Sequence, residues 1–569
     1  MAARQSVVTP SPDRGLSGLR LFLLASAVYL LCMTPFFVAY APHLTTSLIG
    51  PPGDNMNDFW DTWYSQRAWE TSGSHFFFTR LIRFPEGVWL YYQSFAYSDL
   101  AAIFLIRKLF HLSAEIPVLL GLHNGILLSS FYLSALGAFY LARRFTRSVV
   151  SALLAGFIFA FSPWHVGQFL GHMNVTTIQF IPFFLIFFFR AMESGKALDV
   201  AGSILFYCLT AVSSWYYFFY ISYFVAFYYL YQVVVQRKLL LRRPLAVMLA
   251  NFAGALLLLS PLLVPMIRLG WNNPDAYAGG VDDYVADALG YFVVGPHHLL
   301  ARLGEPLFSR FTGNTVEGTV YLGLINLGLF AWAFFERRRR PIREMAFLLS
   351  GILLFAMFAS GPHLHILGRP VLPTPVLLLG YLPFFSNVVT PSRAIVFVYV
   401  LLAIGAALGL DAALQACRER GRSPVLWVAP ILLLAMLDFC PVGLPRIHVN
   451  PPRSYAFLAE DPDTSFGVLD LPRGYLQGNA YLFYQTFHHR PIVTATLSRT
   501  IALTLMNTLE TKDLAAQKQQ LIAAHVKYIF IHTDPFSLRN PGEPVDVAAY
   551  LRTYRVVSAD KNCVVLRVY

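Results

Sequence analysis

The sequence predicts an α-helical polytopic membrane protein with about eleven transmembrane helices, which ends in an α/β domain. Hydrophobic residues make up 56% of the 569 residues and charged residues only 13%, with a mean hydropathy of +0.54. Soluble globular proteins are far less apolar. Apolar runs long enough to cross a bilayer recur along the first 440 residues. After Pro441 the apolar runs shorten and alternate with polar residues, a pattern typical of strands.

Eleven apolar runs are the candidate spans, some of them short or tilted. They lie at residues 21–41, 116–142, 148–164, 175–191, 199–213, 216–235, 245–267, 319–335, 344–360, 392–410 and 424–440. Five basic clusters are each separated from the next by two runs: Arg143 to Arg147, Arg190 with Lys196, Arg237 to Arg243, Arg337 to Arg340, and Arg418 to Arg422. Since cytoplasmic loops are enriched in Lys and Arg, the spacing predicts a multi-pass protein of the cell membrane with a cytoplasmic N-terminus.

The stretch from 95 to 112 is apolar but contains Asp99, Arg107 and Lys108. If it crossed the membrane, Arg143 and every later cluster would move outside. We therefore expect an amphipathic helix in the outer interface. The exterior loops are then residues 42–94, 165–174, 268–318 and 361–391.

The last part of the chain, residues 441–569, has the pattern of a soluble extracytoplasmic α/β domain that follows a transmembrane domain of residues 1–440. Ser465 to Asp470 and Val526 to Ile531 read as strands, a helical stretch precedes the second of them, and residues 562–568 read as a further strand.

Composition excludes some classes of function. The net charge is +12, but the basic residues occur in short clusters between apolar runs and form no basic face, so we expect no nucleic-acid partner. The sequence contains no nucleotide-binding glycine loop, which disfavours a nucleotide-powered transporter.

The first exterior loop has three carboxylates, Asp54, Asp58 and Asp61, spaced four and then three residues apart. On a helix this spacing places them on one face. Like charges so close repel, so we expect a cation, an arginine partner or protonation of one carboxylate. The alternative is a solvated acidic loop end with Trp and Tyr anchors at the membrane interface.

Cations and aromatic residues follow in the same loop. Arg80 and Arg83 precede a turn and the aromatic segment Trp89 to Tyr92. The combination suits a sugar or a phosphate near the bilayer surface. The same aromatic residues could equally seat the loop on lipid headgroups.

The order of these features resembles the GT-C superfamily of polyprenyl-phosphate-dependent membrane glycosyltransferases. Asp54 and Asp58 occupy the place of that family's catalytic Asp, and the spacing of Asp61 and Arg67 is similar to that in oligosaccharyltransferase catalytic subunits. The short second loop, with Ser162-Pro163 and then His165, His172 and Asn174, is similar to that of many bacterial members.

The second loop departs from the oligosaccharyltransferase pattern because it holds no carboxylate. A metal site built from acids on both loops is therefore not supported. No cofactor is required by the pattern, and a divalent metal stays open. His165 and His172 could bind a metal or a phosphate, or they could be structural histidines at helix ends.

Late in the chain Thr390-Pro391-Ser392-Arg393 enters the tenth run. Helix-start amides and a guanidinium there are suited to phosphate. The alternative is that Thr390 or Ser392 caps the helix while Arg393 extends to the interface. The loop 268–318 carries further titratable residues with no diagnostic spacing, to which we assign no roles: Asp275, Asp282, Asp283, Asp287, His297, His298, Glu305 and Glu317.

The resemblance implies a hexosyl- or pentosyltransferase of cell-envelope glycan biosynthesis, which moves a sugar from a polyprenyl-phosphate donor to an extracytoplasmic glycan, lipid or protein acceptor. Asp54 or Asp58 is expected to be the general base, and the expected substrate-binding residues are Asp61, Arg80, Arg83, His165, His172, Asn174 and Arg393, with Arg393 meeting the acidic segment in one cleft. Two alternatives stay open: a transporter or flippase for a lipid-linked solute, and a catalytically inactive GT-C-like assembly protein.

Overall fold

The structure, a computed structural model, describes residues 17–71, 75–238, 240–273, 282–336, 342–381, 389–449, 453–459, 461–499, 503–533 and 542–569. Arg337 to Arg340 and Asp275 of the sequence analysis lie outside these residues. The chain divides into two compact units. We call the first the helical unit (Met1–Pro42, Ile126–Pro261, Ala278–Leu444) and the second the mixed unit (His43–Gly125, Leu262–Tyr277, Pro445–Tyr569).

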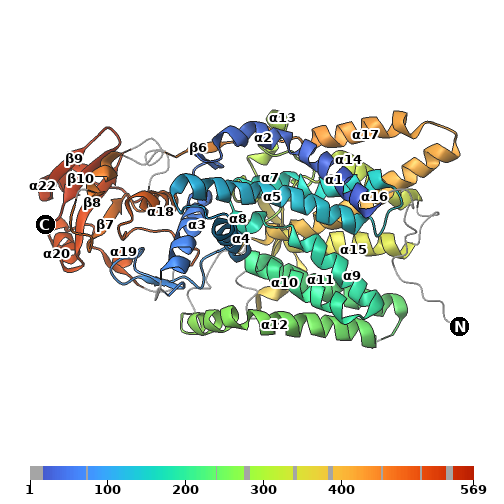
Figure 1. Cartoon of the computed structure of the whole chain (residues 1–569), viewed down its shortest axis with the longest axis horizontal. Coiled ribbons are helices and arrows are strands. Elements are labelled where there is room, and N and C mark those ends of the chain that lie inside the picture. Colours follow the sequence, from blue (N-terminus) through green and yellow to red (C-terminus); the bar gives the residue numbers. More distant parts are fainter. Residues whose placement is uncertain are drawn as a thin grey trace. The chain divides into compact units, whose positions relative to one another are not determined.

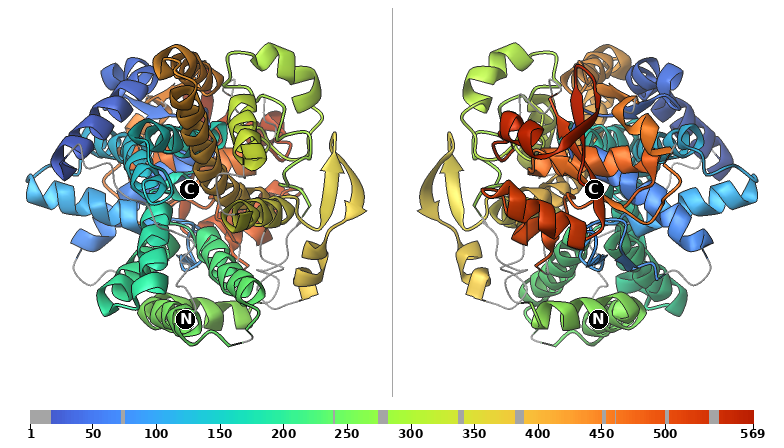
Figure 2. Two further views of the ribbon diagram at one scale, coloured as in Figure 1. Left: turned by 90° about the vertical axis from the view of Figure 1, so that its right-hand side faces the viewer. Right: turned by 90° about the vertical axis from the view of Figure 1, so that its left-hand side faces the viewer.

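The helical unit is built from apolar helices, of which α9, α10 and α11 pack side by side (Figure 1). A two-stranded hairpin of β4 (His363–Ile366) and β5 (Arg369–Pro373) projects at its edge (Figure 2). The helices are α1 (Gly18–Cys32), α2 (Thr34–Tyr40), α6 (Val149–Ala160), α7 (Pro163–Phe169), α8 (Met173–Thr176), α9 (Phe180–Ser194), α10 (Ala197–Ser213), α11 (Trp215–Gln236), α13 (Ala301–Phe308), α14 (Leu324–Phe335), α15 (Ile342–Ala359), α16 (Ile395–Glu419) and α17 (Pro424–Asp438). Two helices, α5 (Ile116–Ala142) and α12 (Arg242–Trp271), contribute to both units.

Helix α16 is the centre of the helical unit. The apolar stretch of this helix is wholly buried, and α6, α14, α15 and α17 pack around it. A helix that is apolar on all sides must be enclosed by protein or by lipid. The short 3₁₀ turn before it, Pro391–Ala394, is buried as well and begins with a proline, which suits a first turn.

Among the described residues, five helices are long and apolar enough to cross a membrane, and two bent pairs, α1 with α2 and α6 with α7, raise the number to seven. The chain is therefore membrane-embedded. Four shorter apolar helices lie at Ala197–Ser213, Leu324–Phe335, Glu344–Ala359 and Val428–Asp438. The expected eleven crossings would be reached if these four also cross, and that number stays a prediction.

The mixed unit joins the first loop to the end of the chain. Strand β1 (Ser47–Ile49) pairs with β6 (Arg446–His448), and α3 (Asp54–Glu70) packs on α18 (Tyr475–His488). The loop continues through the hairpin of β2 (Phe78–Thr79) and β3 (Val88–Trp89) to α4 (Tyr97–Leu109). This last helix lies where the amphipathic helix was expected, and its place at the interface stays a prediction.

A four-stranded sheet forms the rest of the mixed unit, in the order β7-β8-β10-β9. Strands β7 (Gly467–Leu471) and β8 (Val526–His532) are parallel, whereas β10 (Cys563–Arg567) runs antiparallel to β8 and to β9 (Arg555–Ala559). The strands and the helix α20 (Leu514–Ala523) lie where the alternating pattern predicted them. The short helices α19 (Leu505–Thr508) and α22 (Val547–Thr553) complete the segment.

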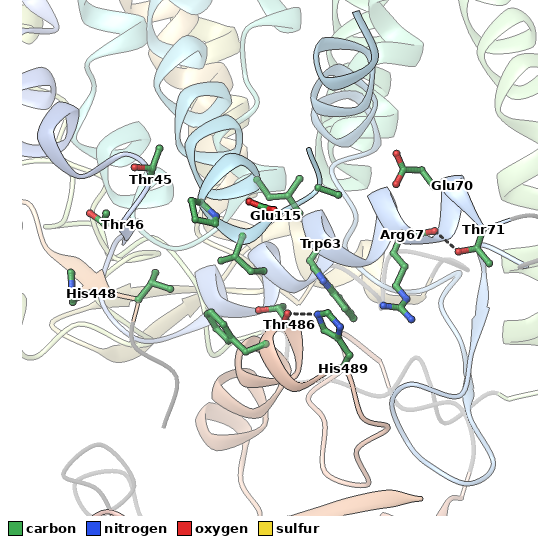
Figure 3. A pocket seen from close by; sticks show the side chains of 16 residues that line it. Thr45, Thr46, Trp63, Arg67, Glu70, Thr71, Glu115, His448, Thr486 and His489 are labelled. Atoms are coloured by element: carbon green, nitrogen blue, oxygen red, sulfur yellow. Dashed lines mark hydrogen bonds between the residues drawn. The ribbon is translucent and has the colours of Figure 1, made fainter. Parts of the chain in front are cut away.

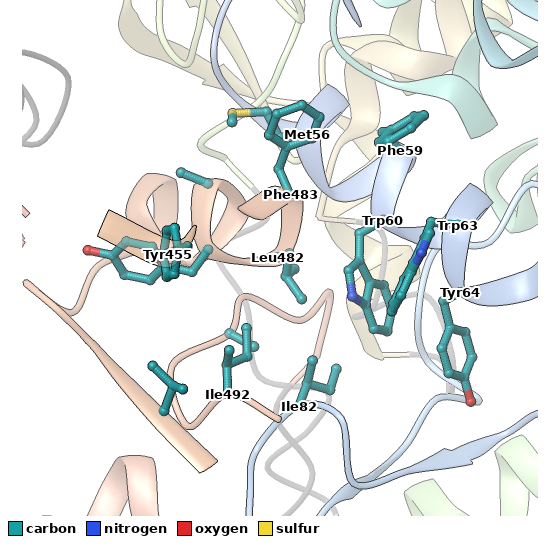
Figure 4. Packing of buried hydrophobic residues seen from close by; sticks show 14 of the residues in the cluster. Met56, Phe59, Trp60, Trp63, Tyr64, Ile82, Tyr455, Leu482, Phe483 and Ile492 are labelled. Carbon is teal, nitrogen blue, oxygen red and sulfur yellow. The ribbon is translucent and has the colours of Figure 1, made fainter. Parts of the chain in front are cut away.

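The two faces of this sheet bury different partners, because successive strand residues point to opposite sides. Leu469, Ile529 and Leu566 pack with residues of α20 and α22. Val468, Phe530 and Val565 pack with α18 and, through it, with the aromatic residues of α3. Figure 4 shows this second core, in which Phe483 of α18 lies beside Met56 of α3 and Leu482 lies on the side of Trp60. The first loop is thereby fixed to the C-terminal sheet.

Candidate active site

Helix α3 carries three acidic residues, Asp54, Asp58 and Asp61, on one face. It begins at Asp54, and Asp58 and Asp61 follow at intervals of four and three residues. Asp58 and Asp61 are buried, whereas Asp54 is half-buried in the first turn. A carboxylate in the first turn is stabilised by the helix dipole. The helix thus has the geometry that the spacing predicted.

Gln93 binds Asp61, the last of the three carboxylates along α3. Its Nε2 donates to Asp61 Oδ1 at 2.9 Å and to Asn57 Oδ1 at 3.0 Å. The hydroxyl of Ser498 donates to Gln93 Oε1 at 3.4 Å, so the C-terminal segment contacts the same group. Burial raises the pKa of the Asp61 carboxyl well above its usual range, the charge of Asp58 raises it further, and the Gln93 hydrogen bond opposes both. Asp61 therefore retains a proton more readily than a solvated Asp does.

Asn479 of α18 binds Asp54, the first of the three carboxylates along α3. Its Nδ2 donates to Asp54 Oδ1 at 2.8 Å, and its side chain is wholly buried. Its Oδ1 has no hydrogen-bond partner among the described residues. Together, Gln93 and Asn479 fix two of the three carboxylates by side-chain amides that lie far away in the sequence.

The two predicted cations of the first loop differ. Arg83 is buried, its Nη1 lies 2.7 Å from Met506 Sδ, and burial lowers its pKa to about 10. The Arg80 side chain is exposed. Neither arginine forms an ion pair with Asp54, Asp58 or Asp61 in the described part of the chain. Arg83 is packed as a structural residue would be, and Arg80 is open to solvent.

Arg393 lies in the helical unit at the start of α16, where it forms a buried ion pair. Its Nε and Nη2 donate to Glu317 Oε1 at 2.9 and 2.6 Å, and its guanidinium carbon lies 4.5 Å from the ring centroid of Tyr216. The hydroxyl of Ser392 donates to Glu317 Oε2 at 2.9 Å. The expected cation is present, but its position is set by a carboxylate to which the sequence assigned no role.

Glu317 is also tied to the second short loop. Gln168 Nε2 donates to Glu317 Oε2 at 3.1 Å, and Gln168 Oε1 lies 2.9 Å from His172 Nδ1. Burial alone would raise the pKa of Glu317, but the charges of Arg393 and His172 and the hydrogen bonds outweigh it and hold the pKa below its usual value. The structure thus brings Arg393 and His172 into one network around an ionised Glu317.

His165 and Asn174 are placed differently from His172. His165 is wholly buried, its Nδ1 lies 2.6 Å from the Ala160 carbonyl, and its Nε2 lies 2.9 Å from the Thr176 carbonyl. Both ring nitrogens are therefore occupied by the turns on either side of α7. Asn174 is buried in α8. The geometry of His165 is that of a helix-end structural histidine.

In the described residues, no group of three or more His, Cys, Asp or Glu side chains is arranged so that it could bind a metal ion. The sequence left the requirement for a divalent metal open, and it stays open. The residues that sequence reasoning missed are Gln93, Gln168, Glu317 and Asn479. Only Glu317 gave a signal, as a carboxylate in an exterior loop.

A family model matches residues 56–439 of the chain, and its description is a domain of unknown function, DUF6311. No protein with a curated description matches by sequence. Solved structures do match by fold. The oligosaccharyltransferase of Archaeoglobus fulgidus in its apo form aligns with a TM-score of 0.56 and 14% identity, over 91% of this chain and 70% of that one.

Two further structures give the same picture. The archaeal oligosaccharyltransferase AglB from Archaeoglobus fulgidus, in complex with an inhibitory peptide and a dolichol-phosphate, aligns with a TM-score of 0.53 and 12% identity, over 90% of this chain and 69% of that one. The arabinofuranosyltransferase AftD from Mycobacteria aligns with a TM-score of 0.54 and 14% identity, over 97% of this chain and 40% of that one. At such low identity the likeness shows the fold alone, which this chain shares with the oligosaccharyltransferase and the arabinofuranosyltransferase.

Proposed function

Because the chain belongs to the family of the domain of unknown function DUF6311 and has the GT-C fold, we propose that it is a membrane glycosyltransferase. It moves a sugar from a polyprenyl-phosphate donor to an acceptor hydroxyl or amide outside the cytoplasm. The acidic face of α3 carries this proposal, since it presents buried carboxylates on a rigid helix at the start of the first loop. That the similar oligosaccharyltransferase was solved with a dolichol-phosphate supports a lipid-phosphate donor.

In the proposed reaction the acceptor oxygen or nitrogen attacks the anomeric carbon of the donor sugar, and the bond from that carbon to the phosphate oxygen breaks. Asp54 or Asp58 takes the proton of the attacking group as general base. Asp61, whose pKa is raised by burial, is the less suitable base, since it keeps its proton. Its role is to hold the helix face with Gln93.

The leaving lipid phosphate gains negative charge in the transition state and needs a fixed cation. We assign this part to Arg393. Glu317 binds its Nε and Nη2 atoms, which leaves the Nη1 edge to meet a phosphate oxygen. Glu317 lowers the net positive charge of the site, but it also fixes the position of the Arg393 guanidinium. A hydrogen-bond donor that is already in position stabilises the transition state best, because it does not have to reorganise. His172, linked to Glu317 through Gln168, is assigned to the same phosphate.

The test is incubation of the purified full chain with a panel of polyprenyl-phosphate sugars, with release of the lipid phosphate as the readout. Asp54→Asn or Asp58→Asn is expected to lower the rate by about 10²-fold or more, as loss of a general base does. Arg393→Lys is expected to lower kcat more than it raises KM, because the lost contact belongs to the transition state.

Glu305→Gln is the matched control, since Glu305 is an exposed carboxylate of another loop and its loss should leave the rate unchanged. Full activity in both the Asp54→Asn and the Asp58→Asn variants, with the control equally active, would remove the proposed mechanism. A folded wild-type protein that releases no lipid phosphate from any donor would instead favour the inactive assembly protein.

A further inference from the structure

A cavity of about 840 Å³ lies in the mixed unit, on the side of α3 that faces away from the carboxylates. Trp63, Arg67 and Glu70 line it (Figure 3). They repeat the spacing of Asp54, Asp58 and Asp61 nine positions later, and nine residues are about 2.5 helical turns. The two sets therefore point in opposite directions from the helix axis. The cavity is therefore separate from the acidic face.

One wall of the cavity is cationic. Arg67 is exposed, its guanidinium carbon lies 5.6 Å from the Trp63 ring centroid, and no described carboxylate forms an ion pair with it. Glu70 on the same helix face is already bound, by Arg107 Nη2 at 3.0 Å and Lys108 Nζ at 2.7 Å. The other lining carboxylate, Glu115, lies on the opposite wall from the Arg67 guanidinium (Figure 3).

His489 lies beside Arg67 in the cavity wall and adds no second positive charge. Its ring lies 5.4 Å from that of Trp63, and burial, followed by the charge of Arg67, lowers its pKa. The Nε2 of His489 lies 2.9 Å from the Thr486 carbonyl, which only accepts, so a neutral ring carries its proton on Nε2 and has no N–H left for an anion. Arg67 is therefore the cation and the donor of this wall. The hydroxyl-bearing residues Thr45, Thr46 and Thr71 also line the cavity.

The opposite part of the wall is apolar and belongs to the start of a membrane span. Ile116, Pro117 and Leu119 come from the first turn of α5, one of the helices long and apolar enough to cross the bilayer. Thr45 and Thr46 follow two and three residues after the bent pair that ends at His43. The cavity therefore lies where two candidate spans begin or end, which is the level at which polar headgroups meet hydrocarbon.

We propose that this cavity binds a phosphate-bearing amphiphile, with the phosphate on Arg67 and the hydrocarbon chain on Ile116, Pro117 and Leu119. An exposed guanidinium without an ion-pair partner is suited to phosphate oxygens, and the apolar wall gives the chain a surface to bury. Both a glycerophospholipid and a prenyl phosphate have this chemistry. The site goes beyond the transfer reaction, since binding here requires no turnover and no contact with the acidic face.

The experiment is isothermal titration calorimetry on the purified full chain in detergent. Dioctanoyl phosphatidylglycerol and farnesyl phosphate are the phosphate-bearing probes, and dioctanoylglycerol and inorganic phosphate each supply one half of the chemistry. We expect at least one amphiphile to bind, and Arg67→Gln to weaken it by about tenfold or more, as loss of a charge-assisted hydrogen bond does. Ala114→Trp, at an exposed lining residue, should weaken it similarly by filling the space.

The matched control is Lys518→Gln, which removes another cation that lies over an aromatic ring, 5.8 Å from the Tyr554 centroid, in the same unit but away from the cavity. It should bind as the wild type does. Tighter binding of farnesyl phosphate would identify a prenyl chain, and tighter binding of phosphatidylglycerol a membrane phospholipid. Equal binding by Arg67→Gln, or equal binding of dioctanoylglycerol or of inorganic phosphate alone, would overturn the proposal. None of these outcomes depends on transferase activity.

Discussion

The Asp61 carboxyl differs from a solvated one, since burial and then the charge of Asp58 raise its pKa. A raised pKa means that the folded state binds the proton more tightly than the unfolded state. Stability from this group is therefore complete below about pH 4, the ordinary Asp value, and is lost as the pH rises through the folded-state pKa. We expect Asp61→Asn to melt at a higher temperature than the wild type, by a difference that grows with pH.

The measurement is the melting midpoint of both proteins in one detergent between pH 4 and pH 9. Asp283→Asn is the control for the substitution itself, because Asp283 is exposed. Parallel profiles for wild type and Asp61→Asn would contradict the raised pKa. They would also return Asp61 to the candidates for the general base.

At this scale the sequence predicted what is local. The spacing of Asp54, Asp58 and Asp61 depends only on helix geometry, and α3 has that geometry. The partners Asn479 and Glu317 could not be predicted, because each joins its carboxylate or guanidinium across a gap in sequence that no periodicity spans. His165 was a candidate for substrate binding, but its two ring nitrogens contact the Ala160 and Thr176 carbonyls. The residues next to His165 in the sequence do not predict these contacts.

Helix packing in the helical unit depends on two glycines of α16. A Cβ atom at Gly409 would lie 1.9 Å from the Leu329 carbonyl oxygen, and one at Gly405 would lie 2.1 Å from the Phe330 ring, both of α14. Small residues four positions apart let two helices approach closely. We expect Gly409→Ala to separate α14 from α16 and to cost about 1–3 kcal/mol, as overpacking does.

Gly328 of α14 provides the matched control, since a Cβ there meets nothing within 4 Å. Gly328→Ala should leave the melting midpoint unchanged or slightly raised, because alanine favours the helix. Comparison of the two midpoints in the same detergent isolates the contact from the general effect of replacing glycine. An equally stable Gly409→Ala variant would mean that α14 and α16 do not cross as closely as the structure has them.

At the level of elements, the strands and α20 were predictable because alternation and helical periodicity are local properties. The bends within two spans were not predicted, although proline marked both. The runs at 21–41 and 148–164 read as continuous, yet the helix pairs bend by 51° and 43°. Pro35 and Pro163 stand in the first turns of α2 and α7, where proline has no N–H to donate to a carbonyl of the preceding helix.

For the whole molecule, apolar composition was enough to predict a helical, membrane-embedded chain, because the bilayer restricts a spanning chain to helices. The fold shared with the similar transferases was implied only by the resemblance in the order of features. The partition into units was not evident, since the first loop packs with the C-terminal sheet through contacts such as Trp60 Nε1 to Gln485 Oε1, 2.7 Å apart. Such a pairing joins residues more than 400 positions apart. The sequence divided the chain linearly at residue 440, whereas the mixed unit includes residues 43–125 as well.

The number of membrane crossings can be tested by finding the side of the membrane on which chosen residues lie. Three of the four short apolar helices, α14, α15 and α17, lie between Glu305 and Lys512. With α16 they make four crossings, so we expect Glu305 and Lys512 on the same, extracytoplasmic side. Lys196 lies three expected spans before Glu305 and should be cytoplasmic. All three side chains are exposed, so Lys196→Cys, Glu305→Cys and Lys512→Cys can each be placed in a variant whose five native cysteines are replaced.

A membrane-impermeant maleimide applied to intact cells should label the cysteines at 305 and 512 but not that at 196, while all three should react after the membrane is permeabilised. Labelling at 305 without labelling at 512 would mean that one of the short helices, or all three, does not cross. The C-terminal sheet would then lie in the cytoplasm. Because the sheet packs in one unit with α3, a transferase base that works outside the cell requires the cysteine at 512 to react.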